Sequence, residues 1–318
     1  MVLDKYELDN EAPVLVIGAA GIDIIGRLQG PLDAGTSNPA RIRTSFGGTA
    51  RNVAENLARL GQAVELLSVI GGDQVGQQLL RHTEQAGVTV GGVQISATLP
   101  TGSYLAVIDT QGQLSFGLDD MRALEQVTAD YLRDQKDLFK KAAMLFLDAN
   151  LQPETLATAL ELAAEAGLPV CADPTSTSLA PALTPHLEHI FLLTPNVREA
   201  GVYLEREIDP RDSQAGVMAA KDLVSRGVDF AIVTLAEFGL AYASAEGSGH
   251  IPAIKTEIVD PTGGGDALSA AVIFALLNEI PADEAVRLGI SAASLTLRRR
   301  GSVREDLSLE LLYDQLVI

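Results

Sequence analysis

Short apolar runs alternate with amphipathic segments in the first part of the chain. The runs Val14–Ile17 and Glu65–Ile70 have the pattern of buried strands. Between them, Thr49–Leu60 repeats its apolar residues at helical spacing. Asp73 is expected to cap a second helix. Alternation of strands and helices predicts an α/β fold.

The alternation becomes regular from about residue 140 onward. Strands buried on both faces of a parallel sheet are predicted for the apolar runs Met144–Leu147, Pro169–Ala172, Ile190–Leu193 and Phe230–Leu235. Helices are predicted for Pro153–Ala166, Ser213–Ser225, Ala267–Asn278 and Asp283–Arg298. We therefore expect one doubly wound α/β domain over residues 1–318, with a mainly parallel sheet between layers of helices.

Two regions interrupt this alternation with short extended runs. The first lies at about residues 22–46 and the second at about residues 93–118. Turn residues separate the extended runs of the second region, as in β-hairpins. We expect both regions together to form a small antiparallel β-sheet that covers the α/β core as a lid.

Composition and charge exclude several classes of protein. Hydrophobic residues make up 47% of the chain and charged residues 20%, which excludes a mainly disordered protein. A net charge of −19 argues against binding to bulk nucleic acid or to an anionic membrane. The single cysteine, Cys171, permits no internal disulfide. No apolar run has the roughly 18 residues of a membrane span, and Met1–Asn10 is polar, so we expect a cytoplasmic protein.

A glycine-rich stretch, DPTGGGDAL at residues 260–268, carries the clearest chemical signal. Its three glycines, Gly263, Gly264 and Gly265, precede a long apolar helix, so their N–H groups can converge at the positive end of the helix dipole. Such a turn binds anions, typically phosphate. Asp266 would then accept the proton of a hydroxyl that attacks a γ-phosphate. The alternative is an aspartate that only caps the helix.

A second cluster suits the binding of a sugar. Gly47 and Gly48 open a helix, and Asn52 lies one turn further on. Glycine lets a ligand approach the backbone, and an Asn amide both donates to and accepts from hydroxyls. Asp23 follows the first strand and can accept from two hydroxyls. The alternatives are a tight loop with a solvated Asn52 and a surface turn at Asp23.

A third cluster pairs Asn196 with Glu199 at the start of a helix. Mg²⁺ binds few protein oxygens, often through water, so a carboxylate here suits ATP chemistry. The alternative is an ordinary helix start with an Asn cap and a Glu in the first turn. The sequence holds neither a complete Rossmann fingerprint nor a P-loop, so it does not support a nicotinamide enzyme or a P-loop nucleotidase.

In their order along the chain, the three clusters resemble the signatures of the ribokinase-like (PfkB) carbohydrate and nucleoside kinases, over residues 13–305. The resemblance implies Mg-ATP-dependent transfer of the γ-phosphoryl group to a sugar hydroxyl. It makes Asp266 the catalytic base and the backbone of Gly263, Gly264 and Gly265 the anion hole. It assigns substrate binding to Asp23, Gly47, Gly48 and Asn52. It assigns the nucleotide and its magnesium to Asn196, Glu199, Thr234 and Gly239.

The resemblance also implies a monovalent cation, usually potassium, at Asp260, Thr262 and Gly301. Two positions depart from the family pattern. Ala236 stands where a glycine is common in the nucleotide loop, and Gly264 stands where the glycine-rich signature commonly has an alanine or a similar small residue. Family members often pair through the lid, so a homodimer is expected.

Several segments are similar to the pseudouridine kinase subgroup: residues 37–42, 102–105, 108–109, 120–121 and 147–150. This likeness implies the 5′-hydroxyl of pseudouridine as acceptor. Tyr104, Leu105 and Phe116 would supply an apolar lid over the base. The uracil edge would bind near Asn38, Asn150 or Asp120. Two alternatives stay open, namely another sugar kinase (ribokinase, fructokinase or 2-keto-3-deoxygluconate kinase) and a non-catalytic binding protein on the same fold.

Overall fold

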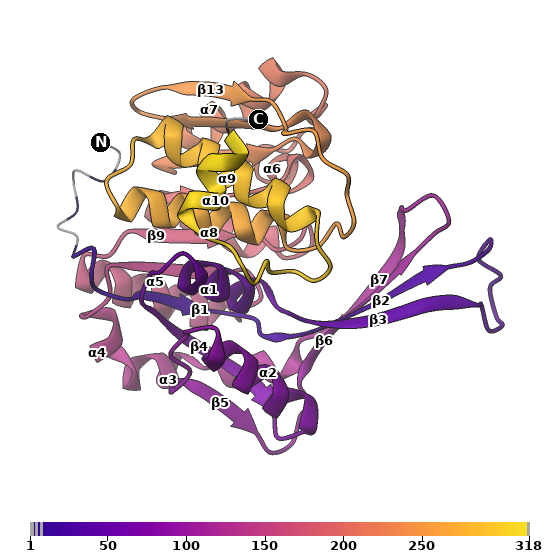
Figure 1. Cartoon of the computed structure of the whole chain (residues 1–318). Coiled ribbons are helices and arrows are strands. Elements are labelled where there is room, and N and C mark those ends of the chain that lie inside the picture. The colour runs from indigo at the N-terminus through magenta and orange to yellow at the C-terminus, as the bar shows by residue number, and fades with distance from the viewer. Residues whose placement is uncertain (1–2, 4–5, 7–8, 317–318) are drawn as a thin grey trace.

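The computed structural model of the chain describes Leu3, Tyr6 and residues 9–316, and two β-sheets organise it (Figure 1). The large sheet has nine strands. In order across the sheet they are β13 (Ser248–Ile251), β12 (Leu240–Ser244), β11 (Phe230–Thr234), β10 (Leu192–Leu193), β9 (Val170–Asp173), β8 (Met144–Asp148), β1 (Val14–Ile17), β4 (Val64–Gly71) and β5 (Val93–Ser96). The strands from β11 to β5 pair in parallel, and β12 and β13 add an antiparallel edge.

Helices cover both faces of this sheet, which confirms the predicted doubly wound α/β fold. One face packs against α1 (Thr49–Arg59), α8 (Gly264–Leu277), α9 (Ala282–Leu297) and α10 (Leu309–Leu316). The other face packs against α3 (Ala129–Asp134), α4 (Lys136–Phe139), α5 (Pro153–Ala166), α6 (Val197–Leu204) and α7 (Ser213–Ser225). Helix α2 (Gln74–Gln85) packs against β4, and the 3₁₀ turns are η1 (Arg122–Gln126), η2 (Ala180–His189) and η3 (Ala236–Phe238).

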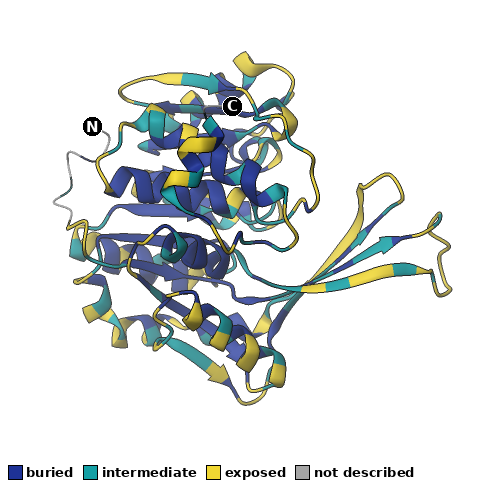
Figure 2. Ribbon diagram, viewed as in Figure 1, coloured by how far each residue is buried: buried dark blue, intermediate teal, exposed yellow. Residues whose placement is uncertain are grey.

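The central strand β1 shows why the strands are continuously apolar. Leu15 and Ile17 belong to the core on one face of the sheet, whereas Val14 and Val16 belong to the core on the other. Successive side chains of a strand point to opposite faces, so a strand between two helix layers needs apolar residues at every position. Figure 2 shows this buried centre in dark blue.

The four-stranded sheet contains most of the segments expected to form a lid, and it projects from the body as an arm (Figure 1); it is called the lid below. Its strands are β3 (Ala40–Gly47), β2 (Gly21–Leu28), β6 (Gly102–Ile108) and β7 (Leu114–Asp120), in that order. Strands β2 and β3 are antiparallel, as are β6 and β7, but β2 and β6 run in parallel. The predicted purely antiparallel lid is therefore wrong, because the chain returns to the lid only after passing through the large sheet.

Two further expectations need correction. The run at residues 93–95, assigned to the lid, forms β5, which pairs in parallel with β4 at the edge of the large sheet. The second lid segment therefore begins at Gly102. The strand predicted at Ile190–Leu193 is reduced to Leu192–Leu193, because η2 extends to His189. Among the residues that the structure describes, no helix has the length and apolar character to cross a membrane.

Candidate active site

The glycine-rich stretch enters α8, with Gly263 as the N-cap. Gly263 has a φ of 77°, and a Cβ added there would lie 1.9 Å from the carbonyl oxygen of Ser302. Both the left-handed backbone and this close approach require glycine. The first N–H groups of a helix have no partner within it, so the amides that follow Gly263 are available to an anion.

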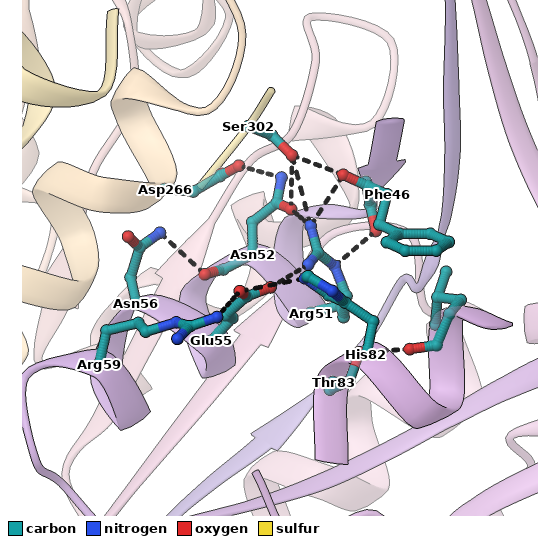
Figure 3. A network of polar contacts seen from close by, with 12 residues as sticks. Phe46, Arg51, Asn52, Glu55, Asn56, Arg59, His82, Thr83, Asp266 and Ser302 are labelled. Carbon is teal, nitrogen blue, oxygen red and sulfur yellow. Dashed lines mark hydrogen bonds and ion pairs between the residues drawn. The ribbon is translucent and has the colours of Figure 1, made fainter. Parts of the chain in front are cut away.

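Asp266 stands in the first turn of α8 and is partly buried. Its Oδ2 accepts a hydrogen bond of 2.6 Å from Nδ2 of Asn52 on α1 (Figure 3). Burial raises the pKa of Asp266 to about 7, against the lowering effect of the Asn52 hydrogen bond. A carboxylate with this pKa can gain and lose a proton near neutral pH, as a general base requires.

The amide of Asn52 is held in one orientation by donors on its other side (Figure 3). Its Oδ1 lies 3.0 Å from Oγ of Ser302 and also accepts from Nη2 of Arg51. Since these donors occupy Oδ1, the Nδ2 side faces Asp266. Sequence reasoning assigned no role to Ser302 or Arg51, and Ser302 lies 250 residues from Asn52 along the chain.

Beneath Asn52, Arg51 and Glu55 form a fully buried ion pair within α1, with Nη1 and Oε2 2.5 Å apart. Glu55 also contacts Arg59 at 3.0 Å and Nε2 of His82 at 3.2 Å. Burial would raise the pKa of Glu55, but the hydrogen bond with His82 and the charge of Arg51 lower it to about 2. His82 is half-buried, and its ring lies 4.9 Å from that of Phe46.

Asp23 on β2 is buried beside Gly47. A Cβ at Gly47 would lie 2.4 Å from Oδ1 of Asp23, so a side chain there would displace the Asp23 carboxylate. Burial raises the pKa of Asp23 to about 6, and Arg51 opposes that shift. Gly48 is the N-cap of α1, so Asp23, both glycines and Asn52 meet at one place, next to Asp266.

Tyr104 on β6 is paired in register with Asp23, so the two share a face of the lid. Leu105 and Phe116 lie on the opposite face, because alternate residues of a strand point to opposite sides. The expectation that all three cover a base on one side is therefore wrong for Leu105 and Phe116. Phe116 is 42% exposed on the outer face.

The residues proposed to contact the uracil edge have partners within the protein. The Asn38 amide holds the β2–β3 loop through the backbone of Asp33, at 2.8 Å. Asn150 donates to Asp148 at 2.9 Å, and Asp120 pairs with Arg122 at 2.6 Å.

Asp148 is a buried carboxylate that sequence reasoning left without a role. It accepts hydrogen bonds from the backbone N–H groups of Ala19, at 2.8 Å, and Ala50, at 3.0 Å. These bonds fix the end of β1 against the start of α1, where Asp23 and Asn52 emerge. An aspartate after an apolar run was the available signal, but its partners lie up to 129 residues away.

A cavity of about 570 Å³ opens on the other side of the glycine turn. Thr234 and Gly239, expected at the nucleotide, both line it, together with Gly264 and Gly265. Its apolar wall includes Leu268, Ile290 and Leu297. The cavity and Asp266 thus share the same helix N-terminus, which suits a nucleotide whose phosphates end beside Asp266.

Asn196 and Glu199 form a capping box at the start of α6. Oδ1 of Asn196 accepts from the N–H of Glu199 at 3.1 Å, and Oε2 of Glu199 accepts from the N–H of Asn196 at 2.9 Å. Burial raises the pKa of Glu199. Burial also raises the pKa of Asp173 at the end of β9, and the negative charge of Glu199 adds to that rise. Within residues 9–316 no three metal-binding side chains cluster. Mg²⁺ needs only one or two carboxylates beside phosphates and water, so Glu199 fits such an ion.

Asp260 fits a monovalent cation poorly, because donors already occupy both carboxylate oxygens. Oδ1 accepts from the N–H and the hydroxyl of Thr262, at 3.2 and 2.8 Å. Oδ2 accepts from the N–H of Gly301 at 2.8 Å and contacts Nη2 of Arg43 at 2.5 Å. The three residues expected at the cation thus do lie together, and a guanidinium lies against them.

Comparison with known proteins agrees with this geometry. Residues 12–307 match the pfkB family carbohydrate kinases. Pseudouridine kinase from Escherichia coli (strain K12) is 33% identical over 297 residues, covering 93% of this chain and 94% of the relative. Guanosine-inosine kinase from Exiguobacterium acetylicum is 29% identical over 283 residues, covering 88% and 93% of the two chains.

A solved structure has the same fold. It is a putative ribokinase II from E. coli in complex with ATP and Mg²⁺, with a TM-score of 0.81 and 19% identity. The alignment covers 96% of this chain and 99% of that one. The chain therefore belongs to the pfkB family of carbohydrate kinases, and it is an ATP-dependent phosphotransferase that acts on a hydroxyl group.

Proposed function

We propose that this kinase transfers the γ-phosphoryl group of Mg-ATP to the 5′-hydroxyl of pseudouridine. The observation that carries the proposal is the position of Asp266, between the amides of the α8 N-terminus and the Asp23–Asn52 cluster. The 33% identity to a pseudouridine kinase favours this nucleoside among the acceptors of the family. Ribokinase, fructokinase and 2-keto-3-deoxygluconate kinase activities remain the alternatives.

In the proposed mechanism, Asp266 receives the proton of the 5′-hydroxyl as that oxygen attacks the γ-phosphorus. The amides after Gly263 stabilise the charge that develops on the transferred group. Asp23, Asn52 and the backbone at Gly47 and Gly48 hold the sugar, and Tyr104 lies on the same face of the lid. Mg²⁺, when bound, neutralises phosphate charge, and Glu199 with the adjoining Asn196 would hold it through water.

The substrate is tested by kcat/KM for pseudouridine, uridine, guanosine, ribose and fructose with Mg-ATP. Pseudouridine is expected to exceed ribose and fructose, because binding energy from the base also helps to orient the reacting hydroxyl. If ribose or fructose equals pseudouridine, the substrate proposal is wrong, while the kinase assignment stands.

We also propose that two copies pair through the outer face of the lid. Ile42, Phe116 and Leu118 share that face and are 72%, 42% and 61% exposed. Ile42 lies on β3 and the other two lie on β7, at the two edges of the sheet, and exposed apolar side chains on one face mark interaction surfaces. Sedimentation of the wild type and of the Ile42→Lys/Leu118→Lys variant tests the proposal. A wild-type monomer at assay concentration would overturn it.

The monovalent cation is not part of this proposal, because it would have to displace Arg43 from Asp260. Potassium dependence stays a prediction of the resemblance to the family. It is tested by comparing turnover in the presence and absence of potassium.

A further inference from the structure

A positively charged side chain of lid strand β3 contacts Asp260, the first residue of the glycine-rich stretch that leads to α8. Arg43 lies on β3, and its Nη2 is 2.5 Å from Oδ2 of Asp260. Asp260 is fully buried, whereas the Arg43 side chain is 26% exposed. The contact joins residues from two different parts of the fold, the lid and the start of the glycine turn.

Asp260 determines the course of the glycine turn. Its carboxylate holds Thr262 on one side and the N–H of Gly301 on the other. Its own N–H donates to the carbonyl of Leu297 at the end of α9, at 3.2 Å. Three residues after Asp260 the chain reaches Gly263, so any shift of Asp260 would move the amides that face the phosphate.

A fully buried carboxylate is costly unless a positive charge compensates it. The hydrogen bonds from Thr262 and Gly301 are neutral. Over residues 9–316, the ion pair of Asp260 is the one with Arg43. A potassium ion beside the same carboxylate would lie next to a guanidinium and be repelled by it.

The geometry points to Arg43 as the positioning residue that supplies this charge in place of a monovalent cation. This inference rests on the proposed function, since it concerns the anion site used for phosphoryl transfer. Arg43 shares a face of the lid with Asp23, and Arg27 on β2 donates to the carbonyl of Val259 at 3.4 Å. Closure of the lid on the sugar therefore also sets the glycine turn.

The first test is turnover in a buffer whose only monovalent cation is tetramethylammonium, compared with the same buffer containing potassium chloride. Wild-type turnover is expected to be equal in the two buffers. Without potassium, Arg43→Ala is expected to lose on the order of 10²-fold in kcat. A loss of this size is typical when reacting groups are misplaced, here the amides of the glycine turn. Potassium or guanidinium chloride should restore most of that loss, and Arg43→Lys should need neither.

The second test needs no substrate. Hydrogen exchange of the Thr262 and Gly301 amides, which donate to the Asp260 carboxylate, is measured in the protein alone. Exchange should be faster in Arg43→Ala than in the wild type, and potassium should slow it only in the variant. Arg41→Ala is the matched control, because Arg41 is exposed on the same strand and the same face, and it should behave as the wild type in both tests.

Three results would overturn the inference: a wild type that needs potassium, an Arg43→Ala variant that behaves as the wild type, and a loss in Arg43→Ala that no cation restores. If Arg43→Ala fails to fold, the inference is tested by the turnover of the wild type and of Arg43→Lys, each measured with and without potassium. If no acceptor is phosphorylated, the proposed function fails, and the exchange measurement still decides the role of Arg43.

Discussion

At the scale of single residues, Glu55 fixes the position of Asn52 through Arg51. It neutralises Arg51, which in turn holds Asn52. Glu55→Gln leaves a buried guanidinium without its counter-charge, so we expect a loss of about 3–5 kcal/mol in the free energy of unfolding. Urea unfolding at neutral pH measures this loss. The control is Asp137→Asn in the exposed pair with Lys140, where the change should stay below about 1 kcal/mol. Equal effects of the two substitutions would show that the buried pair is not important for stability.

The raised pKa values of Asp23 and Asp266 predict a pH dependence of activity. Burial raises them to about 6 and about 7. A protonated Asp266 cannot accept the substrate proton, so kcat/KM should fall as the pH drops below an apparent pKa between about 6 and about 7. Above that range the base is ionised and the curve should level off. A pH–rate profile measures this, and a flat profile down to pH about 5 would contradict an ionising base with a raised pKa.

At the scale of elements, the loop from β11 to β12 carries strain next to the cavity that we propose for the nucleotide. Ala236 has a φ of 52°, a conformation that costs a residue with a Cβ roughly 1–2 kcal/mol. Glycine would relieve that strain but lose roughly 0.5–1 kcal/mol in chain entropy, so Ala236→Gly should change the free energy of unfolding by less than about 1 kcal/mol. At Gly239 a Cβ would lie 2.0 Å from the carbonyl oxygen of Ile251, so Gly239→Ala should lower both stability and nucleotide affinity.

Thermal unfolding and calorimetric titration with a non-hydrolysable ATP analogue separate the two substitutions. If Gly239→Ala binds the analogue as tightly as the wild type, Gly239 does not shape the nucleotide cavity. If Ala236→Gly destabilises strongly, the loop depends on a contact of the Ala236 methyl group.

Elements with local signals were predictable from the sequence. Helices α5 and α7 have the predicted bounds, because Pro153 starts one and Asp212 caps the other. Strand β5 had no such signal, since a short apolar run can pair with either sheet and only the tertiary fold decides. The glycine pair and the glycine turn drew attention to Asn52 and Asp266, which the structure brings into contact. The contacts of Ser302, Asp148 and Arg43 join distant segments that no local pattern reveals.

At the scale of the whole molecule, the lid should close on the substrate. Its own apolar cluster is small, consisting of Ile25, Ala106 and Ile108, so its local stability should be low. Hydrogen exchange in β6 and β7 should slow when pseudouridine and a nucleotide bind together. Strand β5 is an internal control, because it belongs to the large sheet and should not respond. Unchanged exchange in β6 and β7 would indicate a rigid platform.

The role of Asp266 in phosphoryl transfer is tested most directly by turnover and ATP affinity measured together in Asp266→Asn. Asparagine keeps the shape of the side chain but cannot take the proton of the attacking hydroxyl. We expect turnover to fall by about 10²–10⁴-fold while the Kd for ATP stays close to that of the wild type. Asp137→Asn on the surface should leave both values unchanged. Near wild-type turnover in Asp266→Asn would contradict the assignment of Asp266 as the general base.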